Sequence, residues 1–304
     1  MTEFVRKPLR ALFRAATRFY PREHGKYSIL MKIYFPYLAP VPPSKEVVLL
    51  NSGIRMELEL NEYLQSQLYL FGTFEPATVK VLKQMVKAGD TVLDIGANVG
   101  YIALEMAKCV GSSGKVFAFE PDEKNFNLLK RNLELNPDCN IVPIARAVSE
   151  TNAPIRLYKS MFDFNNGAHS TLPSEKHSTD FIEIPAATID SFVQENNIQK
   201  IDVIKIDIEG AEMSAFKGMR QTLSRFRPIV LSELCAEHQS RAGYTTQAVK
   251  AWMTTTFQMQ AFKVAESGTL HKVSLAEEHL ADNVVFIPNE RIPEFQVLIT
   301  KNER

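Results

Sequence analysis

From about residue 76 onward, short apolar runs alternate with segments of helical periodicity, and this alternation restricts the possible folds more than any other feature. The runs are apolar throughout, which indicates strands covered by helices on both faces and therefore a parallel sheet. Right-handed crossovers between such strands produce a layered architecture. We therefore predict an α/β fold of the Rossmann-like type, with a mostly parallel twisted sheet and helices on both faces.

The predicted elements alternate in order along the chain. The strands are expected at residues 91–95, 116–119, 141–148, 203–206 and 229–231. The helices are expected at residues 78–86, 101–109, 123–135 and 211–225. Residues 151–190 interrupt the pattern, because they are polar and hold two short strand-like runs, 154–158 and 181–185, around a loop. A long loop inside a compact domain usually has a function.

Composition excludes several classes of protein. The 304 residues are 45% apolar, and Lys plus Arg balance Asp plus Glu at 35 each. This balance argues against nucleic acid as a partner bound through a globally basic surface. Three cysteines without a CxxC pair predict neither a disulfide framework nor a zinc site, and favour a reducing, cytoplasmic location. No apolar run reaches the roughly 20 residues that a membrane span needs, and arginines interrupt any signal-peptide core.

Residues 1–26 form a basic arm with seven Lys and Arg against two Glu. Arginines recur every four residues from position 6 to position 22, which predicts a helix with a basic stripe. The apolar side chains expected to pack on the main domain are Val5, Leu9, Leu12, Phe13, Ala16 and Phe19. Alternatively, the arm is an interfacial helix on an anionic membrane or acidic partner, peripheral to the membrane, or a transit peptide. We place the arm and a Pro-rich extended linker at residues 1–44, the main domain at 45–290 and a tail at 291–304.

The most specific motif joins the first predicted strand to its helix, where Asp94, Gly96, Asn98 and Gly100 recur at two-residue spacing. Gly96 permits a sharp turn and a close approach of the backbone to a ligand. The next strand ends at Glu120, which is placed to accept hydrogen bonds from ribose hydroxyls. A pyrophosphate dinucleotide usually requires GxGxxG and would be repelled by Asp94, whereas a cationic amino group would be attracted. The spacing therefore favours S-adenosylmethionine (SAM) over NAD.

These blocks resemble the FkbM family of SAM-dependent methyltransferases. The similarity covers about residues 63–236 and includes DTVLDIGANVGYIALEMAK, GKVFAFEPDEKNFNLLKRNLELN and IDVIKIDIEGAE in the family's order. It implies a class I methyltransferase fold, SAM as the cofactor, and O-methylation of a hydroxyl on a sugar, glycan or natural product. The residues implied to bind SAM are Glu75, Asp94, Gly96, Asn98, Gly100 and Glu120. Glu75 also fits an acid at a helix N-terminus, beside Pro76.

Acidic residues gather where the fourth and fifth strands end, and ligands bind beyond the carboxyl ends of parallel strands. A hydroxyl is a poor nucleophile until it is deprotonated, so a positioned base contributes to its methylation. Asp207 is the first candidate for this catalytic role, Glu209 the second and Glu233 the third. Lys205 points the same way as Asp207 and is expected to pair with an acid. Glu209 and Glu212 are expected to share a helix face, and we predict no metal site.

The polar segment at residues 165–171 resembles the family's Asn-Gly-Ser region and predicts a site for a polyol. We expect Asn166, His169 and Ser170 to bind the acceptor, although a lone loop histidine is often merely exposed. Asp190 is interpreted as a helix cap.

Three rival functions stay open at this point. A non-catalytic SAM-binding or scaffold protein is disfavoured by the intact Asp94, Glu120 and Asp207. An NAD-dependent oxidoreductase is disfavoured by the missing GxGxxG. N-methylation of nucleic acid is disfavoured by the zero net charge and by the lack of an Asn/Asp-Pro-Pro-aromatic run after the fourth strand.

Overall fold

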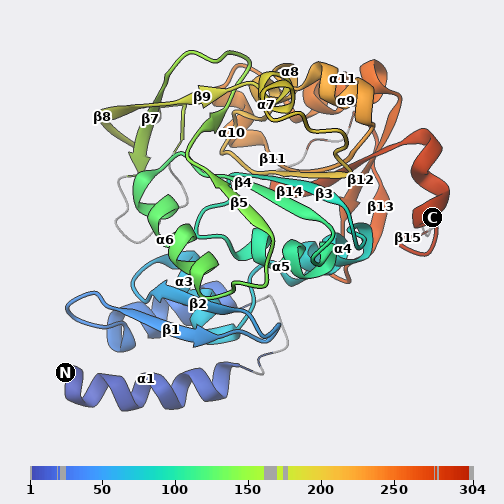
Figure 1. Cartoon of the computed structure of the whole chain (residues 1–304). Helices are drawn as coiled ribbons and strands as arrows, with labels where there is room; N and C mark the ends of the chain where they lie inside the picture. The colour runs from blue at the N-terminus through green and yellow to red at the C-terminus, as the bar shows by residue number, and fades with distance from the viewer. Residues whose placement is uncertain are drawn as a thin grey trace.

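A nine-stranded sheet runs through the centre of the computed structural model (Figure 1). The structure describes residues 2–18, 20, 25–160, 170–173, 177–276, 278 and 281–300. The strands lie side by side in the order β15-β13-β12-β14-β11-β10-β3-β4-β5. Their bounds in chain order are β3 (Thr91–Ile95), β4 (Lys115–Phe119), β5 (Ile141–Ile144), β10 (Val203–Ile206), β11 (Ile229–Cys235), β12 (Met259–Val264), β13 (Leu270–Lys272), β14 (Ala281–Pro288) and β15 (Ile299–Thr300).

One half of the sheet is parallel and the other is mainly antiparallel. The strands β11, β10, β3, β4 and β5 all pair in parallel. Beyond β11, the pairs β11–β14, β14–β12 and β12–β13 are antiparallel, and β15 adds a parallel edge strand next to β13. Parallel pairs outnumber antiparallel ones, so the predicted Rossmann-like α/β fold with a mostly parallel sheet is confirmed.

Helices cover both faces of the sheet (Figure 1). One face carries α4 (Pro76–Met85), α5 (Tyr101–Val110) and α6 (Glu123–Glu134), and the other carries α7 (Ile189–Glu195), α8 (Glu212–Lys217), α9 (Arg220–Phe226) and α11 (Thr246–Phe257), while α10 (Ala236–Arg241) follows β11. Alternate strand residues enter opposite cores. Val92 and Val116 pack in the core with α4–α6, whereas Leu93 and Phe117 pack in the core with α7–α11. Burial of both faces explains why these strands are apolar throughout.

Two predicted elements are divided in the structure. The strand expected at residues 141–148 leaves the sheet after β5, and its end forms β6 (Ala147–Val148), which pairs with β9 (Ala186–Ala187). The helix expected at residues 211–225 breaks at Gly218 into α8 and α9. A Cβ on Gly218 would lie 2.0 Å from the Ser149 carbonyl oxygen, so the close approach of these backbones requires glycine. The two strand-like runs of the polar segment form the antiparallel pair β7 (Ile155–Ser160) and β8 (His177–Ile184).

A further layer lies against α5 and α6 (Figure 1). It consists of α2 (Lys26–Ile29), the π-helix η1 (Leu30–Leu38), β1 (Lys45–Leu49), β2 (Arg55–Glu59) and α3 (Tyr63–Phe71). Leu30 and Tyr34 of η1 are fully buried in the same core as Leu104 of α5. The expectation of an extended Pro-rich linker is therefore wrong as far as Leu38, because burial of this face stabilises a helix around Pro36.

Part of the predicted tail also joins the folded structure. The 3₁₀ helix η3 (Asn289–Phe295) leads into the edge strand β15, and Phe295 and Leu298 are buried against the sheet. Among the described residues, every helix is too short or too polar to cross a membrane. The domain boundaries at residues 45 and 290 remain predictions.

The basic arm forms α1 (Glu3–Thr17), as expected, but its orientation is the reverse of the prediction. Arg10 is 1% exposed, whereas Phe4 is 90% and Leu12 is 69% exposed. Val5 and Leu9 are also exposed, and Ala16 faces solvent with them, while Phe13 alone of the predicted set packs partly against the core. Phe19 lies outside the described residues. The arginines face inward because backbone carbonyls of the layer beneath α1 accept their hydrogen bonds.

Candidate active site

A cavity of about 260 Å³ opens at the carboxyl ends of β3, β4, β10 and β11, where open parallel sheets bind their ligands. The bend after β3, the end of β4, the turn after β10 and the second half of β11 all contribute walls. The charged side chains that line it are Glu75, Glu120, Asp122, Arg146, Lys205, Asp207, Glu209 and Glu233. The structure therefore brings most of the predicted site residues into one cavity.

The bend after β3 is held between the two neighbouring strands. The Gly96 and Ala97 amides both donate to the Phe119 carbonyl of β4, at 3.0 and 2.9 Å. Gly96 has a φ of +83°, and a Cβ there would lie 2.0 Å from the Asp207 carbonyl oxygen after β10. Asn98 also has a positive φ, of +50°, and lines the cavity. Gly100 lies behind the wall at the N-cap of α5, where its missing Cβ makes room for Leu129.

Glu120 is buried at the end of β4 and lines the cavity. Its two carboxylate oxygens accept hydrogen bonds from the amides of Asn98, at 2.8 Å, and of Asp122, at 2.9 Å. Burial raises the pKa of Glu120 to about 7, although the two backbone hydrogen bonds act to lower that pKa. A carboxylate has about four acceptor positions, so two remain for hydroxyl donors in the cavity. The backbone thus fixes this acid in one orientation beside the Gly96 bend.

Asp94 is completely buried and lies behind the cavity wall. Its nearest cation is Lys205, whose Nζ is 3.9 Å from Asp94 Oδ1 and 3.4 Å from Asp207 Oδ2. Neither Asp94 oxygen has a hydrogen-bond partner among the described residues. Burial raises the pKa of Asp94 to about 6, although Lys205 opposes the rise. The expected pairing of Lys205 with an acid is confirmed, and Lys205 lies where the sequence suggested a cofactor amino group.

Lys205 remains a cation in this setting. Burial alone would lower the pKa of its ammonium group, but the carboxylates of Asp207, Asp94 and Glu75 raise it above the ordinary value. Glu75 also lines the cavity at the N-cap of α4 and accepts a hydrogen bond from Asn283 Nδ2 of β14, at 3.2 Å. Burial, followed by the charge of Asp207, raises the pKa of Glu75.

The three candidate bases all line the cavity. The charge of Asp207, with burial second, raises the pKa of Glu233 strongly. Burial raises the pKa of Glu209 to about 8, and Asp207 adds to the rise. Glu209 Oε2 lies 3.0 Å from His238 Nδ1 of α10. Asp207 forms the ion pair with Lys205, with 3.4 Å between Oδ2 and Nζ.

Glu209 and Glu212 do not share a helix face. Glu209 has a φ of +57° and precedes α8, which begins at Glu212. Glu212 is buried and turns back onto the loop, where Oε1 accepts from the amides of Ile208, at 3.0 Å, and Gly210, at 3.3 Å. The prediction failed because Glu209 has a left-handed backbone conformation in the turn between β10 and α8 and is not part of the helix. Glu212 thus holds the turn that carries Asp207 and Glu209.

The predicted acceptor-binding segment is only partly described. Asn166 and His169 lie outside the described residues. Ser170 is buried, and its hydroxyl donates to the Glu209 carbonyl at 3.2 Å, while its backbone pairs with Tyr158 of β7. The neighbouring Thr171, which sequence reasoning did not select, lines the cavity instead.

Asp190 is a cap, as expected, but of a different helix. Its carboxylate accepts hydrogen bonds from the amides of Gln221 and Thr222 at the start of α9, at 3.0 and 2.8 Å. The helix that contains Asp190, α7, is capped by Thr188.

Sequence reasoning also missed the aromatic side of the cavity. Tyr63 and Leu64 of α3 line it together with Phe74. Phe74 belongs to a motif that resembles the family, but nothing in the local sequence links α3 to the distant Gly96 bend. The described residues contain no group of three or more His, Cys, Asp and Glu that could hold a metal ion.

The buried acids predict that stability falls as the pH rises. Burial raises the pKa of Glu62 to about 7, as it does for Glu120, so the folded state holds protons that the unfolded state has lost above pH 4.5. Stability is therefore lost between about pH 4.5 and 7, and each of these two acids contributes about 3 kcal/mol to that loss. We expect calorimetry to give a melting temperature about 5 °C or more lower at pH 8 than at pH 5.5.

A matched pair of variants checks this assignment. Glu62→Gln should flatten the pH dependence, because an amide oxygen still accepts the Gln65 amide hydrogen bond of 2.8 Å but does not titrate. Glu134→Gln, at a position with a 66% exposed side chain, should leave the dependence unchanged. A melting temperature that rises over this range would contradict the prediction.

The layered fold, the bend after the first parallel strand and the acid that follows the next strand define a methyltransferase of the Rossmann-like class. The sequence profile described as the methyltransferase FkbM domain matches residues 94–264, more than half of the chain. The chain belongs to the FkbM methyltransferase family.

Several characterised proteins are similar to this chain. The hexuronic acid methyltransferase AglP of Haloferax volcanii is 28% identical over 159 residues, which cover 52% of this chain and 61% of AglP. The 2-O-methyltransferase NoeI of Sinorhizobium fredii is 24% identical over 167 residues, which cover 50% of this chain and 68% of NoeI. A crystal structure of methyltransferase FkbM from Methylobacillus flagellatus aligns with a TM-score of 0.43 and 19% identity, covering 67% of this chain and 47% of that one. The match to AglP thus spans about three-fifths of that protein's length.

Proposed function

We propose that this chain transfers the methyl group of SAM to a hydroxyl oxygen of a sugar, glycan or related natural-product acceptor. The observation that supports it best is the position of Glu120, a buried carboxylate fixed by two backbone amides beside the Gly96 bend. It shares one cavity with the acids at the ends of β10 and β11. The similarity to AglP, a hexuronic acid methyltransferase, and to NoeI, a 2-O-methyltransferase, supports a sugar hydroxyl as the acceptor.

The cavity residues fit SAM in shape and charge. The free acceptor positions of Glu120 suit the two ribose hydroxyls, and the bare Gly96 backbone permits close approach. The acids Glu75, Asp207, Glu209 and Glu233 outnumber Lys205 in this part of the lining, which favours a sulfonium cation. Bound SAM supplies a methyl group on a good leaving group, so alignment of the acceptor oxygen is the protein's main task.

Asp207 is the proposed base for the acceptor hydroxyl. Lys205 Nζ, 3.4 Å from its Oδ2, keeps the carboxylate oriented, and the proton of the hydroxyl passes to an Asp207 oxygen. Glu209 is the second candidate, with a pKa of about 8 that makes it a base only in mildly alkaline solution. Glu233, whose pKa the charge of Asp207 raises strongly, is the third and is better suited to donate a hydrogen bond.

Calorimetric titration tests the cofactor. We expect SAM to bind the full chain at micromolar concentration and NAD to give no heat above dilution, because the bend after β3 lacks the GxGxxG that a pyrophosphate usually requires. A screen of sugars, uronic acids, glycans and polyols for S-adenosylhomocysteine formation then tests the reaction. Binding of NAD in place of SAM would support an oxidoreductase, and SAM binding without turnover on any acceptor would support a non-catalytic SAM-binding protein.

A further inference from the structure

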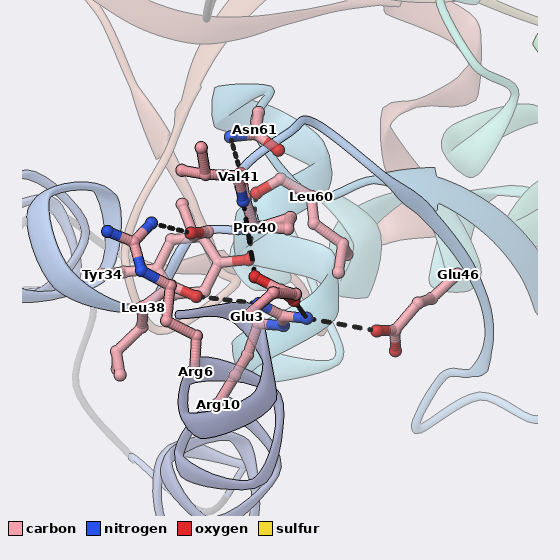
Figure 2. Close-up of polar contacts among 11 residues, drawn as sticks. Glu3, Arg6, Arg10, Tyr34, Leu38, Pro40, Val41, Glu46, Leu60 and Asn61 are labelled. Atoms are coloured by element: carbon pink, nitrogen blue, oxygen red, sulfur yellow. Dashed lines mark hydrogen bonds and ion pairs between the residues drawn. The ribbon is translucent and has the colours of Figure 1, made fainter. Parts of the chain in front are cut away.

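The arginines of α1 are used to attach this helix to the layer beneath it. Figure 2 shows Arg6 and Arg10 reaching from α1 to the end of η1. Arg10 Nη1 donates to the Leu38 carbonyl at 2.9 Å, and its Nη2 donates to Glu3 Oε1 at 2.7 Å. Arg6 Nη1 donates to the Ala39 carbonyl at 2.9 Å. These contacts fix the rotation of α1 about its own axis.

The second half of α1 is attached in the same way. Arg14 Nε donates to the Tyr69 carbonyl of α3 at 3.0 Å, and its guanidinium lies 4.7 Å from the centre of the Tyr69 ring. The hydroxyl of Thr17 donates to the Leu70 carbonyl at 3.1 Å. The polar side chains of α1 therefore make contacts with the layer beneath the helix along its whole length.

The opposite side of α1 presents apolar side chains to the solvent. Between Glu3 and Thr17, every exposed residue except Lys7 is apolar. These residues are Phe4, Val5, Pro8, Leu9, Ala11, Leu12, Ala15 and Ala16, and we call them the α1 apolar face. A helix on the surface of a water-soluble domain normally shows the reverse arrangement, so this face indicates contact with something other than water.

Exposed apolar groups continue onto the segment that holds α1. Ile33 and Tyr37 of η1 are 42% and 62% exposed, and Val41, just beyond it, is 62% exposed. The backbone amide of Val41 donates to Glu3 Oε2 at 3.4 Å, which places this segment beside the start of α1. Figure 1 shows α1 as the outermost element on its side of the molecule, so the face is convex and open.

The net charge around α1 indicates what kind of partner contacts the α1 apolar face. Residues 1–44 contain eight Lys and Arg against two Glu, a net charge of +6, and the rest of the neutral chain carries −6. Lys7 and Lys32 are exposed in the same region as the apolar side chains. An apolar helix face bordered by cations and aromatic residues is the pattern of a helix that lies in the interface of an anionic bilayer. Pairing with a second copy through this face would instead bring two positive regions together.

We propose that the α1 apolar face docks this protein on the surface of an anionic lipid bilayer. Phe4 and Leu12, the two most exposed residues of the face, enter the acyl boundary, while Lys7 and Lys32 meet lipid phosphates. The helix lies in the plane of the interface and does not cross it. This inference stands independently of the proposed methyl transfer.

Vesicle sedimentation of the full chain tests the proposal. We expect binding to phosphatidylcholine vesicles that contain phosphatidylglycerol and much weaker binding to phosphatidylcholine alone. Phe4→Ser combined with Leu12→Ser should weaken binding about tenfold or more, because both side chains lose their apolar contact with lipid. Val297→Ser, at a 98% exposed apolar residue near the other end of the chain, is the matched control and should bind as the native protein does.

Further measurements distinguish a lipid bilayer from a second copy of the chain as the partner of the α1 apolar face. Phe4→Trp should show a blue shift of tryptophan emission when anionic vesicles are added, and circular dichroism should show native folding in every variant. Equal sedimentation of the native chain and the Phe4/Leu12 double variant would overturn the proposal. A dimer in lipid-free ultracentrifugation that the double variant dissolves, without any vesicle binding, would assign the face to a second copy instead.

Discussion

Replacing Gly96 with alanine is expected to abolish SAM binding, with a loss of affinity of about 100-fold or more, since the clash is with main chain and not with a flexible side chain. The added Cβ would lie 2.0 Å from the Asp207 carbonyl oxygen and 3.2 Å from Ile208 Cγ2. The φ of +83° adds strain for any residue with a side chain. Relief requires the bend to move away from the turn after β10, which separates Glu120 from the candidate bases.

Gly111→Ala is the matched control for this variant. Gly111 also has a positive φ, of +64°, but no atom lies within 4 Å of the position that its Cβ would take. It should lose about 1–3 kcal/mol of stability through backbone strain alone, since its φ of +64° and ψ of −164° are adopted almost only by glycine, and bind SAM as the native chain does. Calorimetry and thermal melting measure both effects. Native SAM affinity in Gly96→Ala, or an equal loss in both variants, would contradict the assigned cofactor loop.

The sheet was predictable because the side chains of its parallel strands pack into two hydrophobic cores, one on each face. Val92 and Leu93 are neighbours in sequence yet enter opposite cores, so both positions of β3 before Asp94 must be apolar. The same requirement explains the apolar residues 116–119 of β4 and 203–204 of β10. The antiparallel strands β12–β14 were not predicted, although β12 and β13 form a hairpin, because polar residues such as Lys263 and His271 interrupt their apolar runs.

The site was predictable where it follows from strand order and unpredictable where it depends on side-chain packing. Glu120 and Asp207 were expected at the same edge of the sheet, because the parallel strands β4 and β10, with β3 between them, end there. The burial of Asp94 behind the wall, in contrast, depends on how its side chain packs beside Lys205, its register partner on the neighbouring strand. Thr171 replaced Ser170 at the cavity because the bridge to Tyr158 turns Ser170 inward.

The rotation of α1 shows what helical periodicity omits. The period correctly separated an apolar face from an arginine face, but it carries no information about the surface below. That surface offers the carbonyls of Leu38, Ala39 and Tyr69, which lie at or near the ends of η1 and α3 and accept guanidinium donors. A buried carbonyl without a hydrogen-bond donor destabilises the fold. The free energy gained by pairing these carbonyls with arginines therefore exceeds what burial of a few apolar side chains of α1 would contribute.

Asp207→Asn is expected to lower turnover about 100-fold or more while SAM affinity stays within about tenfold, as for the loss of a general base. Asparagine keeps the size of the side chain and its acceptor oxygen but cannot take a proton from the acceptor hydroxyl. Lys205 keeps Asp94 at 3.9 Å as a partner, so the cavity wall should survive the substitution. Single-turnover kinetics and calorimetry on the same preparation separate the two effects.

Two further variants identify the base if the result differs. Asp282→Asn removes a comparable acid that pairs with Lys263 at 2.6 Å outside the cavity, and it should leave turnover unchanged. Glu209→Gln should keep most activity if Asp207 is the base. If Glu209 is the base, native turnover rises as the pH passes about 8, where Glu209 loses its proton, and Glu209→Gln abolishes both that rise and the activity. Full turnover in Asp207→Asn, together with that alkaline rise, would transfer the role to Glu209, because only an acid with a raised pKa gains basic form in that range.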